Sequence, residues 1–194
     1  NIGFPLSVLL FFSSYEIIIL LFGNQWIDSV PVFKIVSLTI GIQVIYSSAG
    51  SVFQSVNRTD LLFYYGIIGA IILLSGISYG VFIGNSIETV GYGLLVAFAL
   101  NFLIVFYMLI KKALGCSYLL FLKTVSYPLL ISLVMAVPLG IYSKWVGNGN
   151  LFTLIVKLII AILSFLTFFI VKKENRKLLR VGVKVFIQKM KPKQ

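Results

Sequence analysis

The sequence contains no histidine, a single cysteine and only five acidic residues. Without histidine, the chain cannot form a Ser-His-Asp triad, a histidine proton relay or most kinds of zinc site. Cys116 alone cannot form an intrachain disulfide, and five carboxylates leave too few ligands for a metal cluster. No phosphate-binding or dinucleotide-binding glycine motif is present. We therefore expect a protein that is not an enzyme and that holds no metal and no cofactor.

Charged residues are scarce as a class, while apolar residues dominate. Only 11% of the residues are charged, 60% are hydrophobic, and the mean hydropathy is +1.08. The apolar residues form continuous blocks rather than an alternating pattern, and a helix needs about 20 of them to cross a bilayer. Continuous blocks exclude a transmembrane barrel, in which polar and apolar residues alternate. The composition predicts an all-α, polytopic transmembrane helical bundle.

Six apolar blocks are long enough to be membrane spans. They lie at about residues 4–22, 32–56, 61–83, 89–110, 124–142 and 151–171, within a membrane domain of residues 1–172. The connections between them are short, so consecutive helices are expected to run antiparallel. The chain begins with Asn1 rather than methionine, and we interpret it as part of a longer protein.

The net charge of +11 first suggests a nucleic-acid partner, but the placement of the cations argues against one. Nine of the 16 basic residues lie in a basic tail, residues 172–194, directly after the last apolar block. In a helix this tail has an apolar face with Leu179, Val183 and Phe186 and a basic face with Lys177 and Lys184. Such a helix lies on the anionic lipids of the inner membrane surface. We expect residues 173–194 to be an amphipathic cytoplasmic helix and no nucleic acid to bind.

The basic residues also predict the orientation of the chain. The connections on the same side as the tail carry Arg58, Lys111, Lys112 and Lys123, whereas those on the other side carry only Lys144. Because cytoplasmic loops are rich in lysine and arginine, the chain should enter the membrane from the cytoplasm and end there. Trp26 and Trp145 then fall at the outer interface, where indole rings are favoured.

The second block carries the clearest pattern of polar residues. This polar stripe, which would follow one helical face, consists of Thr39, Gln43, Ser47, Gly50 and Gln54. In lipid, such a face must contact protein or a wet cavity. Hydrogen bonding between helices explains the stripe as well as a hydrophilic substrate passage does. Lys34 lies on the opposite face and should extend outward to the interface.

Two further polar residues in the blocks are candidates for the substrate passage. Glu16, in the stretch SSYEII, is the only carboxylate clearly inside an apolar block, and an acid within the membrane indicates a functional site. The alternative is that Glu16 caps a helix that breaks at Ser13–Ser14, nearer the outer surface. Asn101 is a lone amide in the fourth block.

Other small or charged residues have structural interpretations. Gly76, Gly80 and Gly84 form a ridge that predicts close packing of the third block against a neighbour. Arg58 and Asp60 flank a tight turn, where a local salt bridge is expected.

Several stretches resemble the polysaccharide-transporter flippases. These are YEIIILLFGNQWIDSVPVFKI, then VNRTDLLF, the run from Val90 to Leu114 ending in IKKALG, and SYLLFLKTVSYPLLISL. Their order and spacing are similar to those in the colanic acid exporter and in lipopolysaccharide O-unit flippases. Asn57 departs from the family pattern, in which a glycine commonly precedes the arginine.

The resemblance implies a fold and an activity. The family belongs to the multidrug/oligosaccharidyl-lipid/polysaccharide exporter superfamily, whose members have two helical lobes around a cavity. They move undecaprenyl-diphosphate-linked sugar repeats to the outer leaflet of the bacterial inner membrane. This chain would supply the last six helices, in the second lobe. Its partners would be the lipid-linked oligosaccharide, a polysaccharide polymerase and glycosyltransferases. A drug or cation antiporter of the same superfamily and a membrane subunit without transport of its own are the alternatives.

Overall fold

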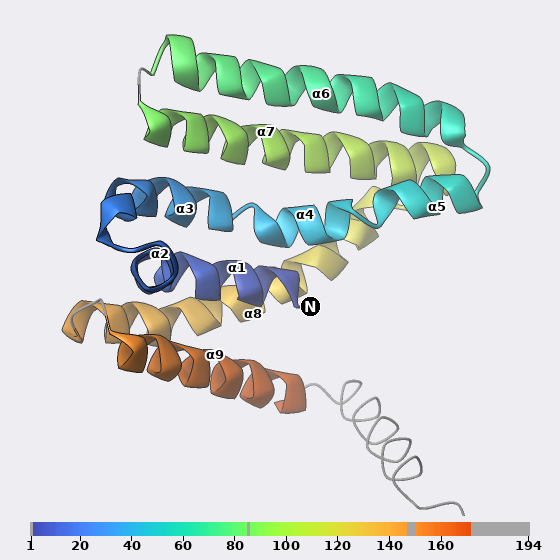
Figure 1. Cartoon of the computed structure of the whole chain (residues 1–194). Helices are drawn as coiled ribbons and strands as arrows, with labels where there is room; N and C mark the ends of the chain where they lie inside the picture. The colour runs from blue at the N-terminus through green and yellow to red at the C-terminus, as the bar shows by residue number, and fades with distance from the viewer. Residues whose placement is uncertain (1, 85, 147–149, 172–194) are drawn as a thin grey trace, which may run out of the picture.

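The structure is a computed structural model that describes residues 2–84, 86–146 and 150–171. Every regular element in these ranges is helical, so the predicted all-α bundle is confirmed (Figure 1). The elements are α1 (Gly3–Phe12), α2 (Ser14–Phe22), η1 (Asn24–Ser29), α3 (Val30–Ser37), α4 (Ile40–Tyr46), α5 (Ala49–Ser55), α6 (Thr59–Phe82), α7 (Ile87–Tyr107), η2 (Met108–Ala113), α8 (Tyr118–Trp145) and α9 (Leu151–Val171). The amphipathic helix expected at residues 173–194 lies outside the described residues.

The long helices lie side by side, and those that follow one another in the chain alternate in direction (Figure 1). The α2–α3 connection, the end of α8 and the beginning of α9 lie at one end of the bundle, and the α5–α6 turn lies at the other (Figure 1). The first end carries the exposed rings of Trp26 and Trp145, and the second carries Arg58. The orientation of these ends in the membrane stays a prediction.

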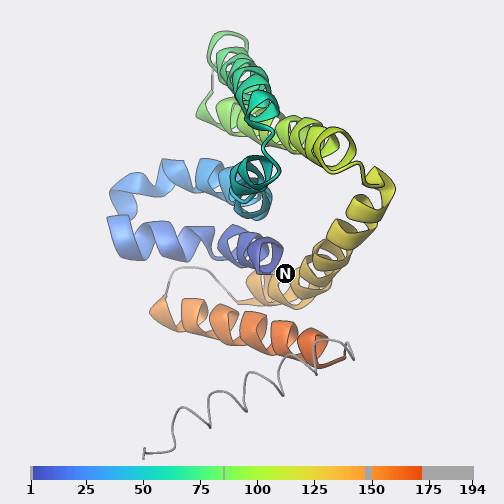
Figure 2. The same ribbon diagram turned by 90° about the vertical axis from the view of Figure 1, so that its right-hand side faces the viewer.

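The helices are stacked in the order α6, α7, α3–α5, α1 and α8–α9. The α6–α7 pair lies on one side of the molecule and the α8–α9 pair on the other, with α1–α5 between them (Figure 2). α7 packs against α3 and α4, and α1 packs against α4 and α8. α1 therefore joins the two sides, and so does α2, which packs against α3 and α9.

Buried apolar residues form two clusters rather than one core. The larger cluster joins α5, α6, α7 and η2 and includes Phe53, Tyr65 and Phe106. The smaller cluster joins α8 and α9 to α1 and includes Met135, Leu139 and Ala161. Most other large apolar side chains are exposed, which is the expected state of a surface that faces lipid.

The first predicted span, residues 4–22, is broken. α1 ends at Phe12, α2 begins at Ser14, and the two axes differ by 70°. The Ser14 hydroxyl donates to the carbonyl of Phe11 at 3.0 Å, and such local bonds from serine weaken and bend a helix. The break expected at Ser13–Ser14 is therefore present.

The second predicted span, residues 32–56, contains a bend. The segment up to Ser37 and the segment from Ile40 are bent by 46° relative to each other. Around this break, the hydroxyls of Ser37 and Thr39 donate to carbonyls three residues earlier, at 2.8 and 2.7 Å. The amide of Gly41 in the first turn of α4 instead bonds to Ser7 Oγ of α1 at 2.6 Å. The mean hydropathy is calculated over a window of residues that includes both sides of such a break, so it does not reveal the break.

Three single helices in the described part are long and apolar enough to cross a membrane: α6, α8 and α7 with its π-helical extension η2. The two bent pairs would raise the number of spans to five. The sixth predicted span coincides with α9. Within this helix, the segment Leu151–Leu166 is apolar but shorter than the three long helices. The connection expected at residues 111–123 is largely helical, because η2 runs to Ala113 and α8 begins at Tyr118.

The glycine ridge lies in the contact between α6 and α7, as predicted. A Cβ atom placed on Gly80 would lie 2.4 Å from the Cα of Val90, and one on Gly76 would lie 2.6 Å from the carbonyl oxygen of Gly93. Because the obstructing atoms belong to the backbone of α7, they cannot move as a flexible side chain could. Only glycine allows the two helices to approach so closely.

This contact predicts that Gly80→Ala destabilises the protein while Gly66→Ala does not. Gly66 lies on the same helix, and a Cβ atom there would meet nothing within 4 Å. We expect Gly80→Ala to lower the free energy of unfolding by about 1–3 kcal/mol through overpacking. Unfolding of the full-length protein in detergent, titrated with SDS, measures both variants. Equal stability of the two would show that α6 and α7 do not pack as described.

Candidate functional site

A buried ion pair lies at the break between α1 and α2. Lys157 Nζ of α9 lies 2.5 Å from Glu16 Oε1 of α2, and the two side chains are 1% and 0% exposed. The Lys157 ammonium also donates to the carbonyl oxygen of Phe12 at 2.7 Å. The hydroxyl oxygen of Thr153, one turn earlier on α9, lies 3.4 Å from Glu16 Oε1 and donates its proton to the carbonyl of Asn150 at 2.6 Å. The pair therefore links three elements whose residues are up to 145 positions apart.

Each of the two charges is opposite in sign to the partial charge of the helix end at which it lies. Phe12 is the last residue of α1, where unpaired carbonyl groups give a partial negative charge, and the Lys157 ammonium neutralises it. Glu16 is in the first turn of α2, where unpaired amide groups give a partial positive charge. The ion pair thus stabilises two separate helices with a bend between them.

Glu16 combines features of both interpretations that the sequence left open. It lies just after a helix break, as the capping alternative required, but its carboxylate accepts from Lys157 and from no backbone amide among the described residues. It is also fully buried rather than close to water. Lys157 was not predicted as its partner. Charged residues inside a membrane usually pair with one another, so Lys34 and Lys157 were the available cations, but nothing in the sequence chose between them.

Lys34 is not part of the buried pair. Its side chain is exposed, and its ammonium lies 4.7 Å from the centre of the Phe11 ring, a distance typical of a cation–π contact. The two basic residues within the predicted spans therefore have different environments, although both lie near the same end of the bundle.

The polar stripe extends from a buried end to an exposed end. Thr39 is fully buried, and its hydroxyl oxygen accepts a hydrogen bond of 2.7 Å from Gln43 Nε2. Gln43 is half-buried, whereas Ser47 and Gln54 are exposed. Thr39 and Gln43 therefore form a hydrogen bond with each other inside the protein. The side chains of Ser47 and Gln54 lie at the surface, where they can contact a ligand or another segment.

Asn101 lies apart from the stripe, in the contact between α6 and α7. Its side chain is 1% exposed, and Nδ2 donates to the carbonyl oxygen of Gly69 at 3.1 Å. This bond between neighbouring helices resembles the hydrogen bonds that join helices in membranes. The position favours a packing role for Asn101 over contact with a substrate.

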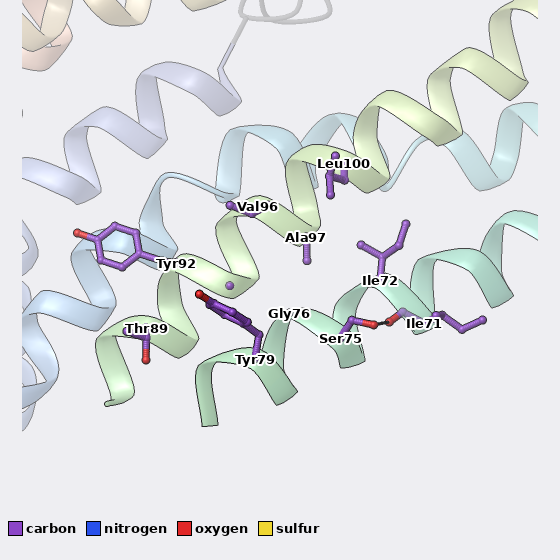
Figure 3. Close-up of a pocket in the computed structure, with 11 residues that line it drawn as sticks. Ile71, Ile72, Ser75, Gly76, Tyr79, Thr89, Tyr92, Val96, Ala97 and Leu100 are labelled. Atoms are coloured by element: carbon purple, nitrogen blue, oxygen red, sulfur yellow. Dashed lines mark hydrogen bonds between the residues drawn. The ribbon is translucent and has the colours of Figure 1, made fainter. Parts of the chain in front are cut away.

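The α6–α7 pair also carries a groove of about 470 Å³ (Figure 3). Aliphatic side chains line most of it, together with the rings of Tyr79 and Tyr92 (Figure 3). The Ser75 hydroxyl points to its own helix and donates to the carbonyl of Ile71 at 2.7 Å. The groove is thus apolar and suits a hydrocarbon chain better than a sugar.

Comparison with known proteins gives three relatives that cover much of the chain. The chain is 25% identical over 146 residues to the lipopolysaccharide biosynthesis protein WzxC of Escherichia coli K12, a match that covers 74% of this chain and 30% of WzxC. It is 30% identical over 104 residues to the teichuronic acid biosynthesis protein TuaB of Bacillus subtilis 168, covering 53% of this chain and 21% of TuaB. An uncharacterized membrane protein in the cps region of Klebsiella pneumoniae is 23% identical over 159 residues, covering 82% of this chain and 33% of that protein.

The chain resembles membrane proteins of polysaccharide biosynthesis. This confirms the resemblance expected from the sequence, and together with the apolar helices it makes the chain a multi-pass membrane protein. The matched stretch spans about a fifth to a third of the length of each relative. No family profile matches the chain, and no solved structure matches it.

Three of the stretches that carry the resemblance contain a residue with a positive φ: Gly23, Asn57 and Gly115. Gly23, in YEIIILLFGNQW, has φ +88°, which side chains rarely adopt. Asn57, in VNRTDLLF, has φ +55°, and asparagine is one of the residues that tolerate this left-handed region. Asparagine is therefore compatible with this turn, at the position where the resemblance led us to expect a glycine. The predicted salt bridge between Arg58 and Asp60 follows directly, at 3.1 Å.

The buried pair predicts that Lys157→Met destabilises the protein strongly. Removing one partner leaves a buried charge without compensation, which costs about 3–5 kcal/mol. The double variant Glu16→Gln with Lys157→Met removes both charges and should recover most of this loss. SDS titration of the full-length protein in detergent measures the unfolding free energies.

Lys34→Met is the matched control, because it removes an exposed lysine near the same end of the bundle. It should change the unfolding free energy by less than about 1 kcal/mol. A loss as large for Lys34→Met as for Lys157→Met, or no recovery in the double variant, would contradict the assigned pairing.

Proposed function

We propose that the protein translocates undecaprenyl-diphosphate-linked oligosaccharide repeat units across the bacterial plasma membrane for surface polysaccharide biosynthesis. The similarity to WzxC and TuaB supports a role in polysaccharide biosynthesis, and the polytopic helical fold supports transport rather than covalent chemistry. A lipid-linked sugar has a large polar head and a tail that can stay in lipid. Its translocation needs a polar path between helices and no chemical reaction.

The observation that carries this proposal is a polar exposed face that begins between α4 and α5 and continues along α5. This hydroxyl face consists of Ser47, Ser48, Ser51, Gln54 and Ser55, all exposed. Of these residues, only Ser47 and Gln54 belong to the polar stripe predicted from the sequence. A face of this kind in an otherwise apolar bundle is unfavourable against lipid, so it must meet protein or a polar substrate.

The serine hydroxyl groups of this face can act as hydrogen-bond acceptors. Each of the four serines donates its proton to the carbonyl three residues earlier, at 2.7–2.9 Å. Their oxygen lone pairs remain available to hydrogen-bond donors. Sugar hydroxyl groups are such donors, whereas a diphosphate is an acceptor and needs cations or amide donors. The hydroxyl face is therefore suited to the sugar part of the substrate.

Several further parts of the proposal follow from the resemblance and the charge distribution. The chain would form part of the second lobe, and the hydroxyl face would meet the cavity between the lobes. Thr39 and Gln43 would support this face from its buried end. The basic tail would bind anionic lipids on the cytoplasmic side, and a polysaccharide polymerase and glycosyltransferases would be functional partners.

Replacing Ser47 and Gln54 by leucine together tests the role of the hydroxyl face. Leucine is well tolerated in membranes, so the protein should insert normally while two polar contacts are lost. At about 1 kcal/mol for each hydrogen bond, export should fall by about tenfold or more. Surface polysaccharide is measured in cells whose only copy of the gene is the variant, and the protein level is measured in the same membranes.

Val44→Leu is the matched control, because it changes an exposed apolar residue on the same segment. It should leave both export and protein level unchanged. Normal export by the double leucine variant at a normal protein level would show that the face does not contact the substrate.

A further inference from the structure

Another groove, of about 370 Å³, lies where α7 continues into the π-helix η2 and meets the beginning of α8. This α7–α8 groove is lined by Leu103, Ile104, Tyr107, Met108, Lys112 and Tyr118. The rings of Tyr107 and Tyr118 pack edge to face with their centres 5.7 Å apart. The Tyr118 hydroxyl donates to the carbonyl oxygen of Leu103 at 3.2 Å, so the protein itself satisfies this polar group. Apart from Lys112, the wall of the groove is therefore apolar.

Two lysines lie at one end of the α7–α8 groove. Lys112 forms part of the wall, and the ammonium of Lys111 lies 5.4 Å from the centre of the Tyr107 ring, a distance typical of a cation–π contact. Both lysine side chains are exposed, and neither has a carboxylate partner among the described residues. Arg58, by contrast, is paired with Asp60. The two lysines therefore carry positive charge that an external anion can neutralise.

The groove runs from this charged end toward the middle of the bundle. α7 ends at the same end of the bundle as the α5–α6 turn, which the distribution of basic residues predicts to face the cytoplasm (Figure 1). Leu103 precedes Lys112 along the helix and lies on the order of 10 Å deeper. A phospholipid has the same arrangement, with a headgroup at the interface and acyl chains that extend into the hydrocarbon.

The lysines distinguish this groove from the one between α6 and α7, which no charged side chain lines. An uncharged lipid would cover the apolar wall of the α7–α8 groove and leave the lysines without a counter-charge. A free anion such as phosphate would neutralise the lysines and leave the apolar wall uncovered. A phospholipid with an anionic headgroup satisfies both parts, because lysines next to a membrane span attract such headgroups.

We propose that the α7–α8 groove binds an anionic glycerophospholipid of the cytoplasmic leaflet. Lys111 and Lys112 contact the headgroup phosphate, and one acyl chain lies along the apolar wall toward Leu103. The π-helical geometry of η2 agrees with a binding site, because such turns occur frequently at functional sites. The site is separate from the basic tail, residues 172–194. It does not rest on the proposed function, because lipid binding is measured without transport.

A single tryptophan in the groove tests this site through quenching by brominated lipid. Tyr107→Trp places the reporter in the wall, and Tyr64→Trp is the matched control, because it lies on α6 at the same end of the bundle, outside the groove, and is 61% exposed. Both are made in full-length protein without other tryptophans, in bilayers that mix phosphatidylglycerol and phosphatidylcholine. Each lysine should contribute about fivefold in affinity, so Tyr107→Trp should report a preference for phosphatidylglycerol of about tenfold or more. Tyr64→Trp should report less than about twofold.

Two charge variants assign this preference to the groove. In the Tyr107→Trp protein, Lys112→Gln should lower the preference by about fivefold, whereas Lys123→Gln, which removes an exposed lysine of α8 outside the groove, should leave it unchanged. Tyr118→Trp provides a second reporter in the groove if Tyr107→Trp does not fold.

Four results would overturn the proposal. The first is an equal preference at the groove tryptophan and at Tyr64→Trp, and the second is an equal loss for Lys112→Gln and Lys123→Gln. The third is loss of the preference when inorganic phosphate is added at constant ionic strength, which would show a site for free anions. The fourth is displacement of phosphatidylglycerol by a small fraction of undecaprenyl phosphate, which would show a site for polyprenyl lipids instead.

Discussion

The buried pair of Glu16 and Lys157 is the interaction on which the arrangement of the helices depends. A single charge in this apolar interior would be strongly unfavourable, so each residue requires the other. The pair also connects α9 to the point where α1 ends and α2 begins. Because the cation lies at the carbonyl end of α1 and the anion at the amide end of α2, the pair fixes both the contact and the bend.

α1 connects the buried ion pair to the rest of the bundle through its contacts with α4 and α8. At one end it meets Lys157, and along its length Ser7 accepts from the amide of Gly41 at the second helix break. The second break turns α4 and α5, and the hydroxyl face begins between them and continues along α5. The position of the hydroxyl face thus follows from two helix breaks that both contact α1, while the glycine contact holds α6 and α7 together independently.

The sequence predicted what depends on composition and short-range spacing. Helical blocks, the α6–α7 glycine ridge, the Arg58–Asp60 bridge and the break at Ser13–Ser14 can each be recognised within a few residues of chain. The partner of Glu16 could not be recognised, because Lys157 lies 141 residues away and Lys34 was an equal candidate. Likewise, Ser48, Ser51 and Ser55 became visible as one exposed face only after the second break had set the direction of α5.

Exchanging the two charges tests the central claim most directly. In Glu16→Lys with Lys157→Glu the ion pair is retained, but the anion faces the carbonyl of Phe12 and the cation faces the amide end of α2. If the helix ends determine the polarity of the pair, the exchanged protein should remain less stable than the parent by about 2 kcal/mol or more in SDS titration. Stability equal to that of the parent would contradict the account, because the charges would then stabilise each other and not the bend.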